Sequence, residues 1–246
     1  MKRAVMLGLC LLAFASLPAR ANIFSNWAVV LVAGDDHAHD GSIADVFDNA
    51  RRDLARALPA IGFSPQNIIQ FSVEPVTDAQ ETKIASIASG LWDLSKRAPG
   101  GCLIYFTSHG AFGGNGEQGG ILTNRDIWTP DRFANAVNNA CGSKPSVIVM
   151  SACFSGQFIP PLAAPNRIIF TAARPDRTSF GCGNDLKYTF FDQCFLQSLP
   201  QAGDFVGLAD LTRQCVALRE RQERVDLPSE PQVSVGNDVY FTLRWK

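Results

Sequence analysis

The sequence lacks a surplus of charge of either sign. Its 22 lysines and arginines nearly balance 23 aspartates and glutamates, so the formal net charge is -1 at pH 7. A protein that binds nucleic acid needs a concentrated basic face, and no basic stripe is present. We therefore expect no nucleic-acid partner. A hydrophobic share of 46% indicates a folded globular chain.

Long hydrophobic runs are absent beyond the start of the chain. A basic start and an apolar stretch over 4–17 precede a small-x-small pattern at 19–21, which is typical of a signal-peptidase cleavage site. The apolar stretch is short for a membrane span. We therefore interpret 1–21 as a cleaved signal peptide and 22–246 as one domain without a stable membrane anchor, which predicts a periplasmic or secreted protein.

The cysteines do not form a redox motif. No Cys-x-x-Cys pair occurs, which argues against a thiol oxidoreductase. The mature chain has six cysteines: Cys102, Cys141, Cys153, Cys182, Cys194 and Cys215. An oxidising compartment permits disulfides, but the spacing does not define their pairing. If Cys153 is a nucleophile, at least one of the other five is an unpaired thiol; the alternative is three disulfides and no nucleophile.

What the sequence does contain is an alternation of buried strands and amphipathic helices. Apolar runs predict strands at 27–33, 67–73, 102–106, 147–150 and 167–171, followed by an edge strand at 239–243. Capping pairs and helical spacing predict helices from Ser42 with Asp45, from Thr77 with Gln80, from Thr129, and over 188–199 and 204–224. This alternation predicts an α/β fold with a mostly parallel sheet wrapped by helices.

Two reactive side chains follow two successive buried strands, where each strand ends. His109 comes directly after one strand and Cys153 after the next. Ligands bind beyond the carboxyl ends of parallel strands, so we expect both side chains in one crevice. A nearby imidazole turns a thiol into a thiolate nucleophile, and the N–H groups of Gly110 and Cys153 are natural donors to an oxyanion. Alone, either residue would be read as structural, but together they indicate a catalytic dyad.

Histidine is scarce, and the two others share one acid-rich loop. His37 and His39 lie within 35–40, where acids and imidazoles alternate. A metal site is one interpretation of that pattern, and a solvated polar rim is the other. No further Cys or His pair lies at ligand spacing, so we favour the rim and expect neither a metal nor a cofactor.

The segments around the two reactive residues resemble a known family. The stretch 105–110 (YFTSHG) is similar to the YFTxHG segment of legumain-type asparaginyl endopeptidases, and 149–156 (VMSACFSG) is similar to their EACxSG segment. Caspases carry a related segment with a His at a comparable distance upstream. A third match, over 171–182, resembles the stretch that follows the family's nucleophile.

The resemblance implies a caspase-like fold, a three-layer αβα sandwich with a central, mostly parallel sheet of about six strands. It also implies that Cys153 and His109 form the dyad and that Gly110 helps to hold the oxyanion. In the family, an extended substrate pairs with the segment after the fifth strand, which corresponds here to Thr178, Ser179 and Phe180.

The specificity pocket departs from the family's pattern. Ser151 stands where the family has an acid or amide that helps to hold the P1 side chain, and the family's pocket Arg has no clear match in 41–44. Asp192 lies near the place of a pocket acid. A preference for Asn or Asp at P1 is therefore not carried over from the family.

These observations predict a cysteine-type endopeptidase that cleaves a protein or peptide substrate through an acyl-enzyme thioester. Two alternatives stay open. A transpeptidase or ligase would use the same dyad and pass the acyl group to an amine instead of water. A catalytically silent binding domain would share the fold, although intact His109 and Cys153 argue against it.

Overall fold

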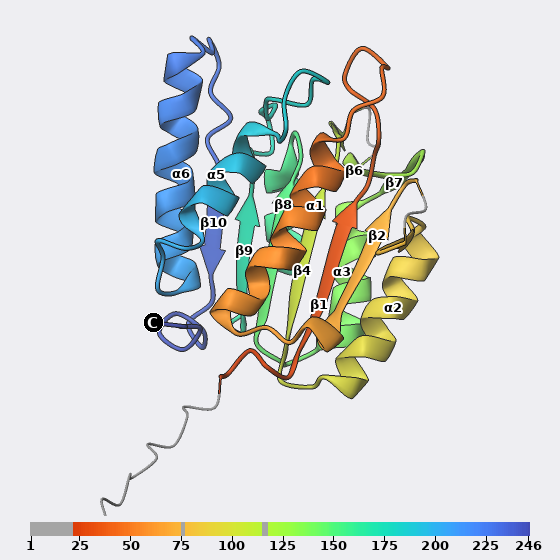
Figure 1. The fold of residues 1–246 in the computed structure, drawn as a ribbon, viewed down its shortest axis with the longest axis vertical. Helices are drawn as coiled ribbons and strands as arrows, with labels where there is room; N and C mark the ends of the chain where they lie inside the picture. Colours follow the sequence, from red (N-terminus) through yellow and green to blue (C-terminus); the bar gives the residue numbers. More distant parts are fainter. Residues whose placement is uncertain (1–21, 75–76, 115–117) are drawn as a thin grey trace, which may run out of the picture.

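A mostly parallel sheet forms the centre of the computed structural model, which describes residues 22–74, 77–114 and 118–246 (Figure 1). The predicted signal peptide, 1–21, lies outside the described residues. The strand order is β10-β9-β8-β4-β1-β2-β3, and within this sheet β10 alone runs antiparallel. The strands are β1 Trp27–Ala33, β2 Ile68–Ser72, β3 Gln80–Glu81, β4 Gly101–Thr107, β8 Ser146–Ser151, β9 Arg167–Thr171 and β10 Gln232–Val235. The five interior predictions are confirmed, and the described sheet has seven strands rather than about six.

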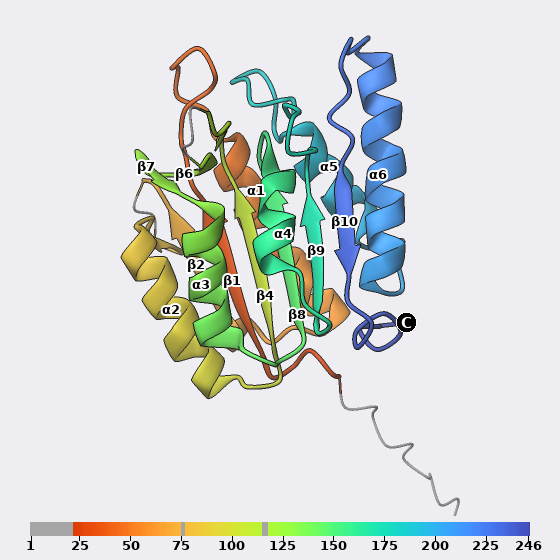
Figure 2. The same cartoon turned by 180° about the vertical axis from the view of Figure 1, so that it is seen from behind.

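Helices cover both faces of this sheet, so the three-layer architecture is confirmed. The face toward the viewer in Figure 1 carries α1 (Val46–Ala57), α5 (Phe190–Ser198) and α6 (Phe205–Gln222). The opposite face, seen in Figure 2, carries α2 (Ile84–Arg97), α3 (Pro130–Cys141) and α4 (Ile159–Leu162). Short 3-10 helices are η1 (Leu58–Ile61), η2 (Pro65–Asn67) and η3 (Ser155–Phe158). None of the described helices is both long and apolar enough to cross a bilayer.

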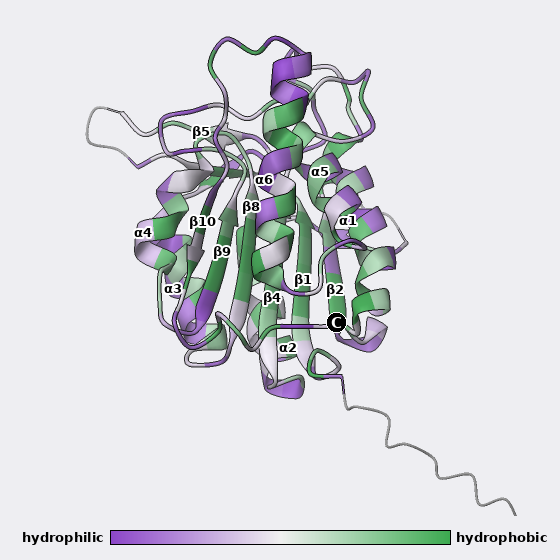
Figure 3. Ribbon diagram, turned by 90° about the vertical axis from the view of Figure 1, so that its left-hand side faces the viewer, coloured by the Kyte–Doolittle hydropathy of each residue, from purple (hydrophilic) through white to green (hydrophobic). Residues whose placement is uncertain are grey.

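Alternation along each strand divides the core into two layers. In β1, Val29 and Leu31 pack into the cluster beneath α1, α5 and α6, whereas Val30 and Val32 pack beneath α2 and α3. All seven residues of β1 and of β4 are buried, which is why these strands appear as unbroken apolar runs, coloured green in Figure 3.

The first helix begins three residues later than the capping pair predicted, with Asp45 rather than Ser42 at the N-cap. The hydroxyl of Ser42 donates to Asp40 at 2.6 Å, and α1 starts at Val46 without a side-chain cap. Ile43, which a helix capped at Ser42 would include, is 66% exposed and pairs with His37 in an isolated bridge. The prediction of a cap at Ser42 was wrong because a local turn takes up its hydroxyl.

The second helix also begins later than predicted. Gln80 and Glu81 form the short edge strand β3 beside β2, and α2 starts only at Ile84. The buried hydroxyl of Thr82 donates to the carbonyl of Ala33 at 2.9 Å, which holds this segment against β1. The capped start at Thr77 was wrong because tertiary pairing outweighs the local capping preference.

The predicted edge strand at 239–243 is wrong as well. That segment forms turns, in which Val239 and Leu243 are buried while Phe241 is 75% exposed. In a strand, residues 239, 241 and 243 would share one face, so alternation cannot bury the first and last of them while exposing Phe241. The edge strand is instead β10, which pairs with β9.

A small antiparallel sheet lies above the carboxyl end of β4. It contains β5 (Gly110–Ala111), β6 (Gly120–Thr123) and β7 (Asp126–Trp128). The amide of Leu122 donates to the carbonyl of His109 at 2.9 Å. His109, two residues after the end of β4, is therefore held in place by a hydrogen bond to this small sheet.

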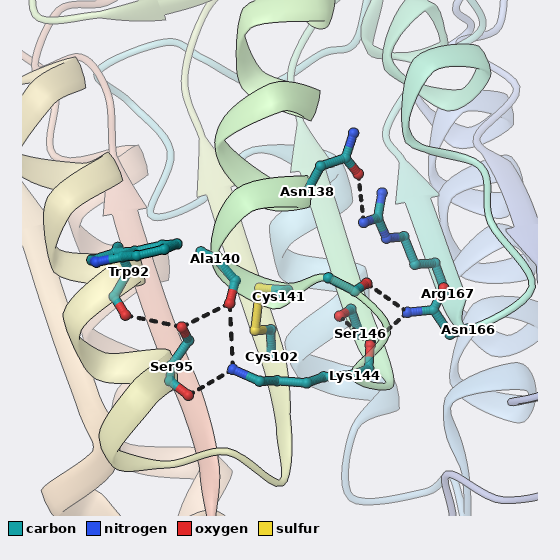
Figure 4. The surroundings of a disulfide bond; sticks show 11 residues. Trp92, Ser95, Cys102, Asn138, Ala140, Cys141, Lys144, Ser146, Asn166 and Arg167 are labelled. Carbon is teal, nitrogen blue, oxygen red and sulfur yellow. Dashed lines mark hydrogen bonds between the residues drawn. A yellow bond between two sulfur atoms is a disulfide. The ribbon is translucent and has the colours of Figure 1, made fainter.

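The opposite end of the central sheet is closed by a disulfide (Figure 4). Cys102 at the start of β4 is joined to Cys141 at the end of α3. Beside it, the ammonium of Lys144 donates to the carbonyls of Ser95 (2.7 Å) and Ala140 (3.3 Å), near the ends of α2 and α3. These bonds satisfy carbonyls that the helices leave unpaired at their C-termini.

A second disulfide, Cys194–Cys215, joins α5 to α6. Cys153 and Cys182 are free thiols. The alternative of three disulfides is therefore excluded, and the expected unpaired thiol beside Cys153 is Cys182.

Candidate active site

The two strands that precede the reactive residues are neighbours. β4 and β8 pair in parallel, with Thr107 opposite Ser151, and the amide of Ser108 donates to the carbonyl of Ser151 at 3.0 Å. His109 and Cys153 each follow two residues after this last pair. The register of the sheet therefore brings both side chains to one edge, where they line the same cavity.

The chain turns sharply directly after Cys153. Phe154 adopts a left-handed conformation with φ of 57°, and η3 begins at the next residue. The amide of Phe154 donates to the carbonyl of Arg177 at 2.8 Å, and the amide of Gly156 donates to that of Ala173 at 2.9 Å. A non-glycine residue at such a φ costs about 1 kcal/mol or more. The surrounding hydrogen bonds stabilise this turn and present Cys153 at its tip.

Gly110 packs directly on the backbone of Cys153. A Cβ added to Gly110 would lie 1.9 Å from the carbonyl oxygen of Cys153, a distance that no side chain tolerates. The glycine next to His109 is therefore a geometric requirement for bringing the two segments together.

Backbone amides surround the Cys153 sulfur. Ser179 N–H donates to Sγ at 3.2 Å, and Sγ lies 3.5 Å from the carbonyl oxygen of Ser179. Burial raises the pKa of the Cys153 thiol above its ordinary value, while hydrogen bonding from the amides of Ser179, Cys153 and Gly110 lowers that pKa in part. The sulfur is therefore within reach of donors that would stabilise an anion.

The imidazole of His109 is fixed by a main-chain carbonyl. Nε2 lies 3.0 Å from the carbonyl oxygen of His37, and since a carbonyl only accepts, Nε2 carries the hydrogen. In a neutral imidazole, Nδ1 then carries no hydrogen and can accept a proton. The ring of Phe47 packs edge-on against the imidazole at 5.1 Å. No hydrogen bond joins His109 to Cys153 in the resting structure; such contacts commonly tighten only when substrate binds.

The acid-rich loop over 35–40 holds the carbonyl of His37 in place through its own hydrogen bonds. The imidazole of His37 contacts Asp36 at 2.7 Å and Asp35 at 3.2 Å, and Asp35 also accepts the amide of His37 at 3.1 Å. The ligand atoms of these three residues lie within 4.8 Å of one another. They satisfy each other by hydrogen bonds, whereas His39 is exposed, with its ring 6.4 Å from that of His109.

The structure places the predicted substrate-binding residues in three different environments. Ser151, Ser179 and Phe180 line the cavity beside Cys153. Thr178 is exposed and lies outside the lining. Asp192 is fully buried beneath the cavity, so its side chain does not reach the cavity surface.

Hydroxyl groups hold the buried carboxylate of Asp192. It accepts hydrogen bonds from Tyr105 at 2.5 Å and Thr107 at 2.6 Å. Burial raises the pKa of the Asp192 carboxyl, and hydrogen bonds from Ser151, Thr107, Tyr105 and Thr189 oppose that rise. The network links α5 to the ends of β4 and β8. Sequence reasoning missed it, although two polar residues at alternate positions of an apolar strand were a visible signal.

Comparisons with known proteins agree with this geometry. The family model described as the Peptidase C13 family matches residues 28–214. A solved structure with a similar fold is the crystal structure of caspase-1 from Spodoptera frugiperda, with a TM-score of 0.61 and 17% sequence identity over 90% of this chain and 92% of that one. No curated protein matches the chain.

Proposed function

The chain belongs to the peptidase C13 family and is a cysteine peptidase of the legumain and caspase-like type, and we propose that Cys153 is its nucleophile and His109 the catalytic partner. One observation carries this proposal. The register of β4 and β8 and the contact of Gly110 with Cys153 bring the two side chains to a single cavity. We infer that the reaction is endopeptidase hydrolysis of a protein or peptide substrate.

The first step transfers one proton and forms one bond. Nδ1 of His109 accepts the proton of the Cys153 thiol while Sγ attacks the carbonyl carbon of the scissile peptide. The carbonyl electrons move to the oxygen, which the amides of Gly110 and Cys153 then stabilise. Hydrogen bonding by both amides lowers the pKa of the Cys153 thiol in part, which supports this role. Each donor of this kind is worth about 10²–10³ in rate.

The intermediate then collapses by breaking the C–N bond. The imidazolium of His109 returns its proton to the leaving amine, and the acyl group stays on Cys153 as a thioester. A water molecule attacks the thioester and gives its proton to His109. The C–S bond then breaks to release the acid, and His109 returns a proton to the Cys153 sulfur. The carbonyl of His37, 3.0 Å from Nε2, accepts a hydrogen bond throughout and stabilises the charged imidazolium.

The substrate backbone is placed by the segment after β9. Ser179 contacts the sulfur through its own amide and carbonyl, and Thr178 next to it is exposed. We propose that an extended substrate pairs with Thr178, Ser179 and Phe180. Such pairing would put the scissile carbonyl beside Cys153.

Peptide-library cleavage by wild type and variants tests this function. Cys153→Ala should abolish cleavage, and His109→Ala should lower kcat/KM by about 10²–10⁴-fold. His39→Ala is the matched control, because it removes a nearby but exposed imidazole. It should retain wild-type cleavage. Cleavage that survives Cys153→Ala would refute the proposal.

We further propose that the mature protein is periplasmic or secreted. The two disulfides support this localisation, because such bonds persist in oxidising compartments. N-terminal sequencing of the protein recovered from cell fractions should begin at Asn22. An intact N-terminus on protein from the cytosol would contradict it.

A further inference from the structure

The cavity beside Cys153 is very small. Its volume is about 10 Å³, roughly the room that one water molecule requires. It lies between the two strand ends, with Ser151 from β8 and Ser179 from the loop after β9 in its lining. It is therefore placed to receive the substrate side chain next to the attacked carbonyl, the P1 side chain.

The walls of the cavity are aromatic and the rest of its lining is neutral. Phe47 and Phe180 contribute the rings, and Ser108, Ser151 and Thr189 contribute hydroxyl groups. Apart from the imidazole of His109 and the two thiols, no lining side chain can carry a charge. A P1 carboxylate or ammonium would find no partner of opposite charge in it.

The nearest acid does not change this conclusion. The carboxylate of Asp192 is fully buried and bonded to Tyr105 and Thr107, with Ser151 and Thr189 also bonding to it. Ser151 and Thr189 themselves line the cavity, so they separate the acid from any P1 group. A cationic side chain could reach Asp192 only by breaking hydrogen bonds that are already formed.

We propose that this cavity is the P1 pocket and that it selects a small, uncharged P1 residue: glycine, alanine or serine. The inference rests on the proposed function and adds its substrate class. A methyl or hydroxymethyl group requires little more room than the water-sized space, and serine would find hydroxyl partners. Larger or charged side chains require the two aromatic walls to separate or a charge to be buried without a partner.

Covalent probes that differ only at P1 test this proposal directly. The probes are acetyl-tripeptidyl acyloxymethyl ketones with Gly, Ala, Ser, Asn, Asp, Lys or Phe at P1. The measured quantity is the second-order rate of Cys153 alkylation, followed by intact mass. We expect the Gly, Ala and Ser probes to react about 100-fold faster than the other four, since a side chain that does not fit commonly loses 10- to 200-fold. Equal rates, or a faster Asn, Asp, Lys or Phe probe, would overturn the proposal.

Variants of the wall sharpen the test. Phe180→Ala removes a ring from the cavity and should raise the rate of the Phe probe relative to the Ala probe by about tenfold. Cys182→Ala enlarges the same cavity with a smaller change and should shift the ratio in the same direction. Phe112→Ala is the control, because Phe112 is 64% exposed and lies outside this lining. A ratio that is unchanged in both wall variants would contradict the proposed pocket.

The two proposals fail in distinguishable ways. Alkylation of Cys153 that requires His109 but follows a different P1 order would overturn the pocket and leave the peptidase intact. Alkylation that is equally slow for every probe and unchanged in His109→Ala would overturn both.

Discussion

The two ends of the central sheet differ in what holds them. At the amino end, the Cys102–Cys141 disulfide and the ammonium of Lys144 tie β4, α2 and α3 together. At the carboxyl end, the same strand β4 leads into His109, and its neighbour β8 leads into Cys153, where the chain leaves the sheet. The difference indicates that stability and chemistry are separated along the length of one strand. Changes at one end should then affect stability and changes at the other should affect activity.

The strongest test of this separation is Gly110→Ala at the carboxyl end. The added Cβ would meet the carbonyl of Cys153 at 1.9 Å and displace the amide that we propose as an oxyanion donor. We expect kcat/KM to fall by about 10²–10³-fold. Gly114→Ala is the control, because no atom of the described residues outside its chain neighbours lies within 4 Å of its added Cβ. Wild-type kinetics for Gly110→Ala would show that the contact is not needed.

The second test removes the disulfide at the amino end. Replacing Cys102 and Cys141 by Ala opens a loop of 39 residues. The free energy of unfolding should fall by about 2–4 kcal/mol, because the unfolded chain gains freedom. Denaturant unfolding measures this loss, and kcat/KM at 25 °C should stay at the wild-type value. A loss of kcat/KM in the folded variant would contradict the separation of stability and activity between the two ends of the sheet.

A smaller effect of the same kind is expected for Lys144→Met. The change removes hydrogen bonds to the carbonyls of Ser95 and Ala140 and keeps most of the aliphatic chain. The free energy of unfolding should fall by about 1 kcal/mol. Thermal unfolding measures the shift, with Lys246→Met as a control at an exposed lysine. Equal stability of the Lys144 variant and the control would show that these bonds contribute nothing net.

The smallest expected effect is on the pH dependence of stability, and it comes from Asp192 at the carboxyl end of the sheet. Burial raises the folded-state pKa of Asp192 above its unfolded value. Its contribution to stability is therefore fully present below the unfolded pKa and is lost as pH rises through the folded pKa. Asp192→Asn removes this dependence, so wild type should lose stability relative to the variant as pH rises from acidic to neutral. An opposite slope in thermal unfolding would contradict the stated direction.

The sequence predicted the features that depend on side-chain type and on the spacing of apolar residues. The strands β1 and β4 were found because both of their faces are buried, which produces unbroken apolar runs. The meeting of His109 and Cys153 at one cavity was predicted because each follows such a run. The wrong helix starts at Ser42 and Thr77 show the limit of local patterns, since tertiary or turn contacts took precedence there.

Other features could not be predicted from residue types. The carbonyl of His37 fixes His109, and every residue has a carbonyl, so no sequence signal marks it. The pairing of Cys102 with Cys141 depends on how β4 and α3 pack, which spacing alone does not define. The burial of Asp192 likewise follows from where α5 lies on the sheet.

The rate of Cys153 alkylation by iodoacetamide, compared between wild type and His109→Ala, tests the central claim most directly. Cys182, the second free thiol, lines the same cavity and serves as an internal reference. If one imidazole activates one sulfur at the meeting of β4 and β8, labelling of Cys153 slows by about 10²-fold or more in the variant while labelling of Cys182 does not. Unchanged labelling of Cys153 in His109→Ala would contradict the account.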